Sequence, residues 1–251
     1  MKKLLFFLTL MVCSATVAGA AVDIRAEMAA IDRALIPVWA LTVEGRLDLA
    51  AKAMPVLQRE WYAFNQRHYG DKTADAGWRA DFDRIDALIR EADSILDGGR
   101  FPDLVRVPLE RVATLFAGLR QRNGIDDYYA DHLIAFRAVM DGIVTAARDQ
   151  NANAGAVDRI RALYPAAREA WGRLPAAGPA AYFHLTTAQR SALAGMVEVE
   201  TKALDLLGRA LDGNDPPAVF AAALAIRPPF LSVYHAFGDF HAMMWLQPAT
   251  K

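Results

Sequence analysis

Apolar residues recur at helical spacing along almost the whole chain, and no segment shows the strict alternation of a β-strand. Glycine and proline fall mainly between the periodic segments, where they end one helix and begin the next. This pattern predicts an all-α protein with eight helices. Their expected bounds are residues 22–41, 47–68, 80–96, 102–122, 127–150, 156–171, 187–211 and 217–240.

Matching residues in the two halves of the chain indicate a tandem duplication. The matched features are Pro55 with Pro165, Trp61 with Trp171, and Leu96-Asp97-Gly98 with Leu211-Asp212-Gly213. Each copy contains enough helices to close its own core, so the sequence predicts two four-helix bundles in series. The first bundle is expected to span residues 21–124 and the second residues 125–251.

Met1–Ala20 has the pattern of a secretory signal peptide, in which two lysines precede an apolar run and the small residues Ala18-Gly19-Ala20. Cys13 is the only cysteine and lies inside this segment, so the mature chain is predicted to contain no disulfide. Export without disulfides indicates a bacterial periplasm. No later apolar run of about 18 residues lacks charges, so no further membrane span is expected, and the mature chain is expected to be a monomer.

Charge and missing motifs exclude several classes of function. The chain has 28 Lys and Arg against 29 Asp and Glu. Removal of Lys2 and Lys3 with the signal leaves 26 against 29, which is unlike the basic surface of a nucleic-acid-binding protein. The sequence contains no Glu-x-x-His, Cys-x-x-Cys-His or Gly-x-Ser-x-Gly motif and no phosphate-binding glycine loop. An enzyme is therefore not predicted.

His235 is the strongest candidate for chemistry, because it lies on an otherwise apolar face of the predicted last helix. Leu231, Tyr234 and Gly238 share that face at helical spacing. Gly238 would leave room beside the imidazole for a flat group. Two interpretations stay open: a buried histidine satisfied by a neighbouring carbonyl or carboxylate, or a ligand of a cofactor. The remaining histidines are expected at the surface: His68, His184, His241 and His132. For His132, a helix-capping role is the alternative.

The chain resembles the cytochrome b562 family, whose members are periplasmic four-helix bundles that hold haem b without a covalent bond. The similarity rests on the signal peptide, four helices per unit, a Gly-containing stop before the last helix and the Tyr234-His235 pair near its end. In the first unit, the apolar positions follow the family's spacing from Met28 to Met54. The similarity covers most of the mature chain.

This resemblance implies that a methionine from an early helix and a histidine from the last helix bind the haem iron. In the second bundle it assigns His235 and Met140 as ligands, with His132 as the alternative to Met140. It further implies electron transfer with a periplasmic redox partner. The last helix of the first bundle has no histidine, so at most one haem per chain is predicted. Aromatic side chains are expected to fill the first bundle instead: Trp39, Trp61 and Phe116.

A second interpretation needs no cofactor. A duplicated bundle that lacks haem keeps its fold, because the apolar pattern encodes the core, and it can serve as a periplasmic module that binds a protein or a small ligand. Leu185-Thr186-Thr187-Ala188-Gln189 also fits the LTxxQ pattern of periplasmic helical stress proteins. A capping box formed by Thr186 and Gln189 explains the same residues as the start of a helix.

Overall fold

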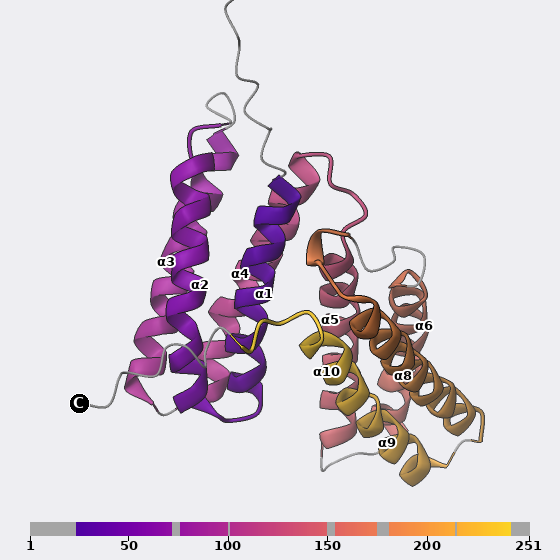
Figure 1. Cartoon of the computed structure of the whole chain (residues 1–251). Helices are drawn as coiled ribbons and strands as arrows, with labels where there is room; N and C mark the ends of the chain where they lie inside the picture. Colours follow the sequence, from indigo (N-terminus) through magenta and orange to yellow (C-terminus); the bar gives the residue numbers. More distant parts are fainter. Residues whose placement is uncertain are drawn as a thin grey trace, which may run out of the picture.

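The computed structural model describes residues 24–71, 76–99, 101–149, 154–174, 181–213 and 215–241. Every regular element within these ranges is a helix, which confirms the predicted all-α class. The elements are α1 (Ile24–Val43), α2 (Leu47–His68), α3 (Ala76–Gly98), α4 (Pro102–Arg122), α5 (Tyr129–Arg148), α6 (Ala154–Gly172), the 3-10 helix η1 (Ala181–Phe183), α8 (Thr187–Gly213), α9 (Pro216–Ala225) and α10 (Arg227–His235) (Figure 1). The predicted signal peptide, Met1–Ala20, lies outside the described residues.

The last predicted helix, residues 217–240, is the one whose extent differs most from the prediction. It is divided into α9 and α10 by a turn at Ile226, and α10 ends at His235. Pro228 and Pro229 in the first turn of α10 explain the division. A proline has no N–H to bond to a carbonyl of the preceding turn, and its ring collides with that turn.

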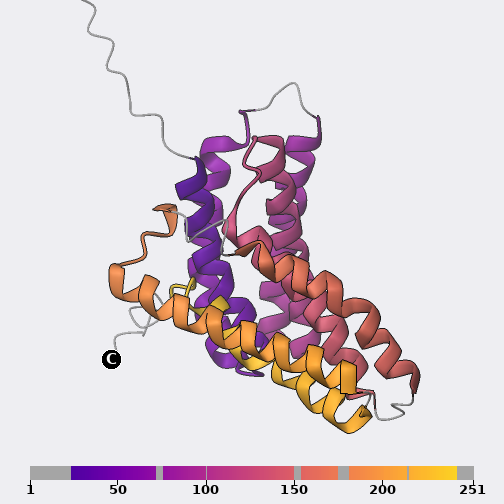
Figure 2. The same cartoon turned by 90° about the vertical axis from the view of Figure 1, so that its right-hand side faces the viewer.

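Figure 1 shows two groups of helices side by side. In the first group, α1 packs against α2 and α4, and α3 packs against α2 and α4. In the second group, α5 packs against α6 and α9, and α8 packs against α9 and α10. The helices of the second group are inclined to those of the first (Figure 2). The groups meet where α10 contacts both α1 and α5.

Aromatic side chains fill the core of the first group. The Trp61 ring lies 5.3 Å from that of Phe82 and meets that of Phe116 edge-on at 5.7 Å, measured between ring centroids. Phe64 stacks on Phe82 at 5.6 Å. Trp61 and Phe116 are thus buried in this group, as predicted. Such ring pairs stabilise a core beyond the area they remove from water, by about 0.5–1.5 kcal/mol each.

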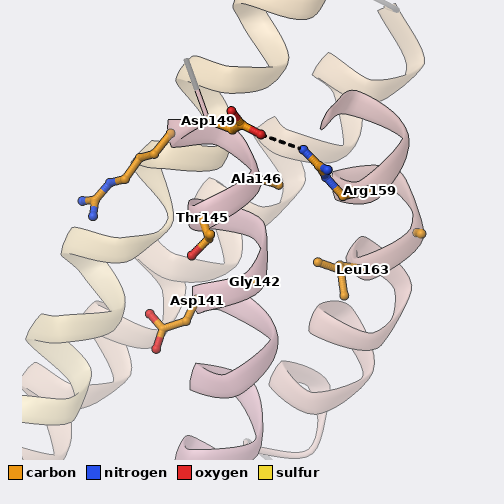
Figure 3. Close-up of a pocket in the computed structure, with 9 residues that line it drawn as sticks. Asp141, Gly142, Thr145, Ala146, Asp149, Arg159 and Leu163 are labelled. Atoms are coloured by element: carbon orange, nitrogen blue, oxygen red, sulfur yellow. Dashed lines mark hydrogen bonds and ion pairs between the residues drawn. The ribbon is translucent and has the colours of Figure 1, made fainter. Parts of the chain in front are cut away.

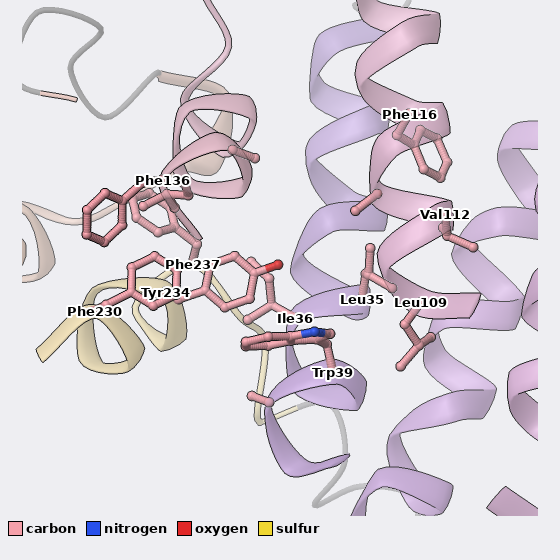
Figure 4. Packing of buried hydrophobic residues seen from close by; sticks show 14 of the residues in the cluster. Leu35, Ile36, Trp39, Leu109, Val112, Phe116, Phe136, Phe230, Tyr234 and Phe237 are labelled. Carbon is pink, nitrogen blue, oxygen red and sulfur yellow. The ribbon is translucent and has the colours of Figure 1, made fainter. Parts of the chain in front are cut away.

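Trp39, by contrast, lies at the junction between the two groups (Figure 4). Its ring meets the Tyr234 ring edge-on, with centroids 5.0 Å apart. The guanidinium carbon of Arg137 lies 4.4 Å from the Trp39 ring centroid. Arg137 is buried, and its Nη1 donates a hydrogen bond of 3.3 Å to the Tyr234 hydroxyl. A cation–π contact therefore joins α1, α5 and α10.

The segment after α10, residues 236–241, returns to the first group and binds α1 (Figure 1). We call it the C-terminal strap. The backbone N–H of Asp239 donates a hydrogen bond of 2.8 Å to the carbonyl of Arg33, and the two side chains lie 3.7 Å apart. Gly238 allows this approach, because a Cβ there would lie 2.9 Å from Cγ2 of Ile36.

Candidate functional site

His235 is half-buried and faces the turn between α1 and α2. Its Nε2 lies 3.6 Å from Oε1 of Glu44 and has no hydrogen-bond partner among the described residues. The two residues line a hollow of about 340 Å³ together with Leu41 and Phe240. Burial lowers the pKa of His235, and Glu44 opposes that shift. The imidazole is therefore biased toward its neutral form.

The face of α10 that enters the core differs from the predicted one. Phe230, Val233 and Tyr234 are buried, whereas His235 lies one position further around the helix. The predicted space beside the imidazole is taken by a flat group of the chain itself, the Phe240 ring, whose centroid lies 5.3 Å away. That ring would also lie within 2.7 Å of a Cβ at position 238.

The second predicted ligand, Met140, is completely buried in α5. It is not among the residues that line the hollow beside His235. His132 lies at the start of α5, where its Nε2 is 2.8 Å from Oδ1 of Asp127. Among the described residues, no three His, Cys, Asp or Glu side chains gather in a metal-binding group. Haem ligation by His235 and Met140 therefore stays a prediction from the sequence.

Of the other histidines, His184 and His241 are exposed, as predicted. His68 was predicted at the surface, and that prediction is wrong, because its side chain is only 13% exposed. Its Nδ1 lies 2.6 Å from Oδ2 of Asp71, and its Nε2 lies 3.2 Å from Oε2 of Glu27. A carboxylate from α1 and one from the turn after α2 thus hold this imidazole between them.

A cleft of about 460 Å³ lies where the two groups of helices meet. Its walls come from the end of α1, the start of α4, the second half of α5 and the start of α10. We call it the junction cleft. Its charged lining residues are Glu44, Asp103, Arg106, Asp141, Arg148 and Arg227. Charges from three helices and from the turn after α1 therefore meet in one hollow.

The arginines of the junction cleft are not equally neutralised. Arg106 forms an ion pair of 2.8 Å with Glu110. Arg148 and Arg227 form no hydrogen bond or ion pair with any other residue that the structure describes. A guanidinium presents several N–H donors in a plane that matches a carboxylate or phosphate. These two side chains are therefore available to an anion from outside the chain.

The carboxylates that line the junction cleft form no ion pair with Arg148 or Arg227. The Asp103 side chain is 97% exposed and therefore well screened by water. Glu44 points toward His235. Burial raises the pKa of Asp141, and the positive charges of Arg227 and Arg137 oppose that shift. Asp141 is thus the lining carboxylate that interacts electrostatically with Arg227, without forming an ion pair with it.

A second, shallower hollow of about 990 Å³ adjoins the junction cleft along α5 (Figure 3). The two share Asp141, Thr145 and Arg148 as lining residues. The second hollow extends between α5 and α6, and we call it the α5–α6 groove. At its end, Nη2 of Arg159 lies 3.1 Å from Oδ2 of Asp149 (Figure 3).

The most extensive buried polar group is centred on Arg120 of α4, which is completely buried. Its Nη1 donates a hydrogen bond of 3.2 Å to Asp32 of α1, and its Nε donates at 2.9 Å to Asp131 of α5. Its guanidinium carbon lies 4.1 Å from the centroid of the Tyr128 ring. Burial raises the pKa of Asp32, and Arg120 and Tyr128 oppose that shift. This group ties α4 to both α1 and α5.

Glu200 of α8 is a completely buried carboxyl group, and neither oxygen has a hydrogen-bond partner among the described residues. Burial raises its pKa to about 9, and the nearby backbone N–H of Phe230, which donates to the Ile226 carbonyl, opposes that shift. At neutral pH the side chain is therefore protonated and uncharged. Its spacing from Leu193, Leu204 and Leu207 places it on the apolar stripe of α8.

Comparison with family models, with curated proteins and with solved structures found no match to this chain. The class defined by the fold is therefore an all-α protein, and the resemblance to cytochrome b562 rests on the sequence pattern alone. One described stretch, Pro216–His235, is long and apolar enough to meet the criteria for a membrane span. That is weak evidence, because the turn at Ile226 interrupts it and Phe230 and Tyr234 lie in the protein core.

Proposed function

We propose that this chain is a periplasmic helical binding module whose junction cleft takes a small organic anion. The observation that carries the proposal is the pair of arginines, Arg148 and Arg227, which line one cleft without a carboxylate partner among the described residues. A bound carboxylate or phosphate would supply the charge-assisted hydrogen bonds that these guanidinium groups do not make within the chain. The periplasmic location rests on the signal-like pattern of Met1–Ala20.

The proposal includes two tandem four-helix bundles of the cytochrome b562 type. Its support is the order of contacts, since α5, α6 and α8 neighbour one another in the second group as α1, α2 and α3 do in the first. The divided pair α9 and α10 would then correspond to α4. In this arrangement the junction cleft is a site between two repeats, which is a common location for ligand pockets.

Calorimetric titration of the mature protein with acetate and inorganic phosphate tests the anion site, with choline as a cationic control. We expect at least one anion to bind, and the double variant Arg148→Ala/Arg227→Ala to lose that binding. The matched control is Arg84→Ala/Arg111→Ala, which removes two arginines from another hollow, of about 440 Å³, between α3 and α4. Absence of anion binding would overturn the proposal, and so would equal binding by the Arg148/Arg227 variant.

Haem binding, with electron transfer to a periplasmic redox partner, is the second candidate function. One observation favours it: Nε2 of His235 has no hydrogen-bond partner among the described residues, and burial lowers the pKa of this side chain. A neutral imidazole nitrogen with a lone pair is the usual histidine ligand for iron. Titration with haemin should then give a Soret band that His235→Ala abolishes. An unchanged spectrum in that variant would remove His235 as a ligand.

A further inference from the structure

The α5–α6 groove differs in chemistry from the junction cleft that it adjoins. Its wall contains small and apolar residues, among them Gly142, Ala146, Ala162 and Leu163. Gly142 lets the two helices approach, because a Cβ there would lie 3.1 Å from Cδ1 of Leu163. Ala162 is exposed and Leu163 is half-exposed. An apolar surface therefore begins where the arginines of the junction cleft end.

At the far end of the α5–α6 groove, the positive charge is already paired with a carboxylate of the chain, so a ligand needs no second negative charge there. This charge belongs to Arg159, which forms an ion pair with Asp149 at 3.1 Å. Arg148 and Arg227 line the junction cleft and have no such partner among the described residues. A ligand that occupies both hollows would therefore have the arginines on the side of the junction cleft, and apolar residues and an already paired arginine on the side of α6.

We infer that the natural ligand is an amphipathic organic anion, with its carboxylate at Arg148 and Arg227 and an apolar body along the α5–α6 groove. This inference rests on the proposed anion site and adds the class of its ligand. Asp141, Thr145 and Arg148 line both hollows, so the two hollows adjoin along α5. The apolar body would cover Ala162 and Leu163, which otherwise face water. A compact anion would leave this surface uncovered, and an anion with charges at both ends would place one charge against Asp149.

Three carboxylates that share one head group test the inference by calorimetry on the mature protein. Octanoate has an apolar body, acetate lacks it, and octanedioate carries a second charge at its end. We expect octanoate to bind at least about tenfold more tightly than either of the others, because each buried methylene contributes about 0.8 kcal/mol and a tenfold change needs about 1.4 kcal/mol. Equal affinity for acetate and octanoate would overturn the inference while leaving the anion site in place. Tighter binding of octanedioate would overturn it as well.

A pair of substitutions on α6 locates the apolar body. Ala162→Gln places an amide in the α5–α6 groove, whereas Ala166→Gln makes the same change at an exposed position one turn further along. The first variant should weaken octanoate binding about tenfold without affecting acetate, and the second should change neither affinity. Equal effects of the two substitutions would contradict the proposed position of the body. If no carboxylate binds the unaltered protein, the anion site itself fails.

Discussion

The hydroxyl of Tyr128 donates a hydrogen bond of 2.7 Å to Oδ2 of Asp32, which lies 96 residues earlier in the chain. Asp32 also receives a hydrogen bond from the buried Arg120, so two donors satisfy one carboxylate between α1 and the start of α5. Burial raises the pKa of Tyr128, which keeps its hydroxyl protonated and able to donate. The two groups of helices thus share a polar contact as well as an apolar one.

Replacement of Arg120 by methionine should destabilise the protein strongly. The variant leaves Asp32 buried with one donor, and loss of one partner from a buried ion pair costs about 3–5 kcal/mol. Urea unfolding followed by circular dichroism measures the effect. The control is Arg122→Met on the same helix, since Arg122 pairs with Asp81 near the surface and such pairs contribute about 1 kcal/mol or less. Similar losses in the two variants would contradict the assigned role of Arg120.

Replacement of Glu200 by glutamine should flatten the dependence of stability on pH. The unfolded chain releases this proton near the usual glutamate pKa of about 4.3, whereas burial raises the folded pKa to about 9. The unfolded state therefore loses its proton first, and the free energy of unfolding falls by up to about 1.4 kcal/mol per pH unit between these values. Urea unfolding at pH 5, 6, 7 and 8 measures this difference. As pH rises, the free energy of unfolding of the variant should increase relative to that of the native chain.

Glu198→Gln is the matched control for that experiment, because Glu198 lies on the exposed side of α8 and pairs with Lys202. Its stability curve between pH 5 and pH 8 should run parallel to that of the native chain. A parallel curve for Glu200→Gln as well would show that the buried carboxyl is not protonated in the folded protein.

Replacement of Glu44 by glutamine should lower the pKa of His235 further. Burial already lowers that pKa, and the Glu44 carboxylate 3.6 Å away partly offsets the effect. Titration of the imidazole by nuclear magnetic resonance follows the change directly. Because the folded pKa lies below the unfolded one, stability is lost as pH falls from about 6.5 through the folded pKa. A His235 pKa that stays constant or rises in Glu44→Gln would contradict the observed pairing.

Replacement of Thr186 by alanine should cost about 1 kcal/mol, because it removes the cap of α8. Gln189 N–H donates to Oγ1 of Thr186 at 3.2 Å, and Thr186 N–H donates to Oε1 of Gln189 at 2.8 Å. These reciprocal bonds confirm the predicted capping box. Urea unfolding measures the loss, with Ser191→Ala on the exposed side of α8 as the control. A loss no larger than that of the control would show that the box does not contribute to stability.

The local features of the chain were predictable because their causes are local. α2 and α4 begin and end where their flanking residues predict, with Pro102 in the first turn of α4 and Gly124 beyond its end. Pro228 and Pro229 disfavour a continuous helix, but the apolar pattern alone could not show that α9 and α10 would separate. In the observed α10, His235 therefore lies beside the buried face rather than on it.

The site could not be predicted in the same way. The junction cleft is formed by side chains from four helices, and nothing near Arg148 in the sequence indicates that Arg227 lies in the same hollow. Arg120 resembles any arginine on a helix until Asp32 and Asp131 are placed beside it by the fold. The burial of Glu200, by contrast, could have been predicted from the sequence. Its spacing places it among the leucines of the apolar face of α8, although a charged residue is normally expected at the surface.

The C-terminal strap contacts α1, the first described helix, although about 200 residues separate the two in the sequence. The order in which the chain is synthesised therefore affects when this contact can form. The ribosome releases α1 well before the strap. Until then, the carbonyl of Arg33 lacks the Asp239 N–H, and Trp39 lacks Tyr234. Contacts between distant ends of a chain form slowly, because the intervening loop must close first. One side of α1 should therefore remain accessible to chaperones and proteases until residues 236–241 have been synthesised and have packed against it.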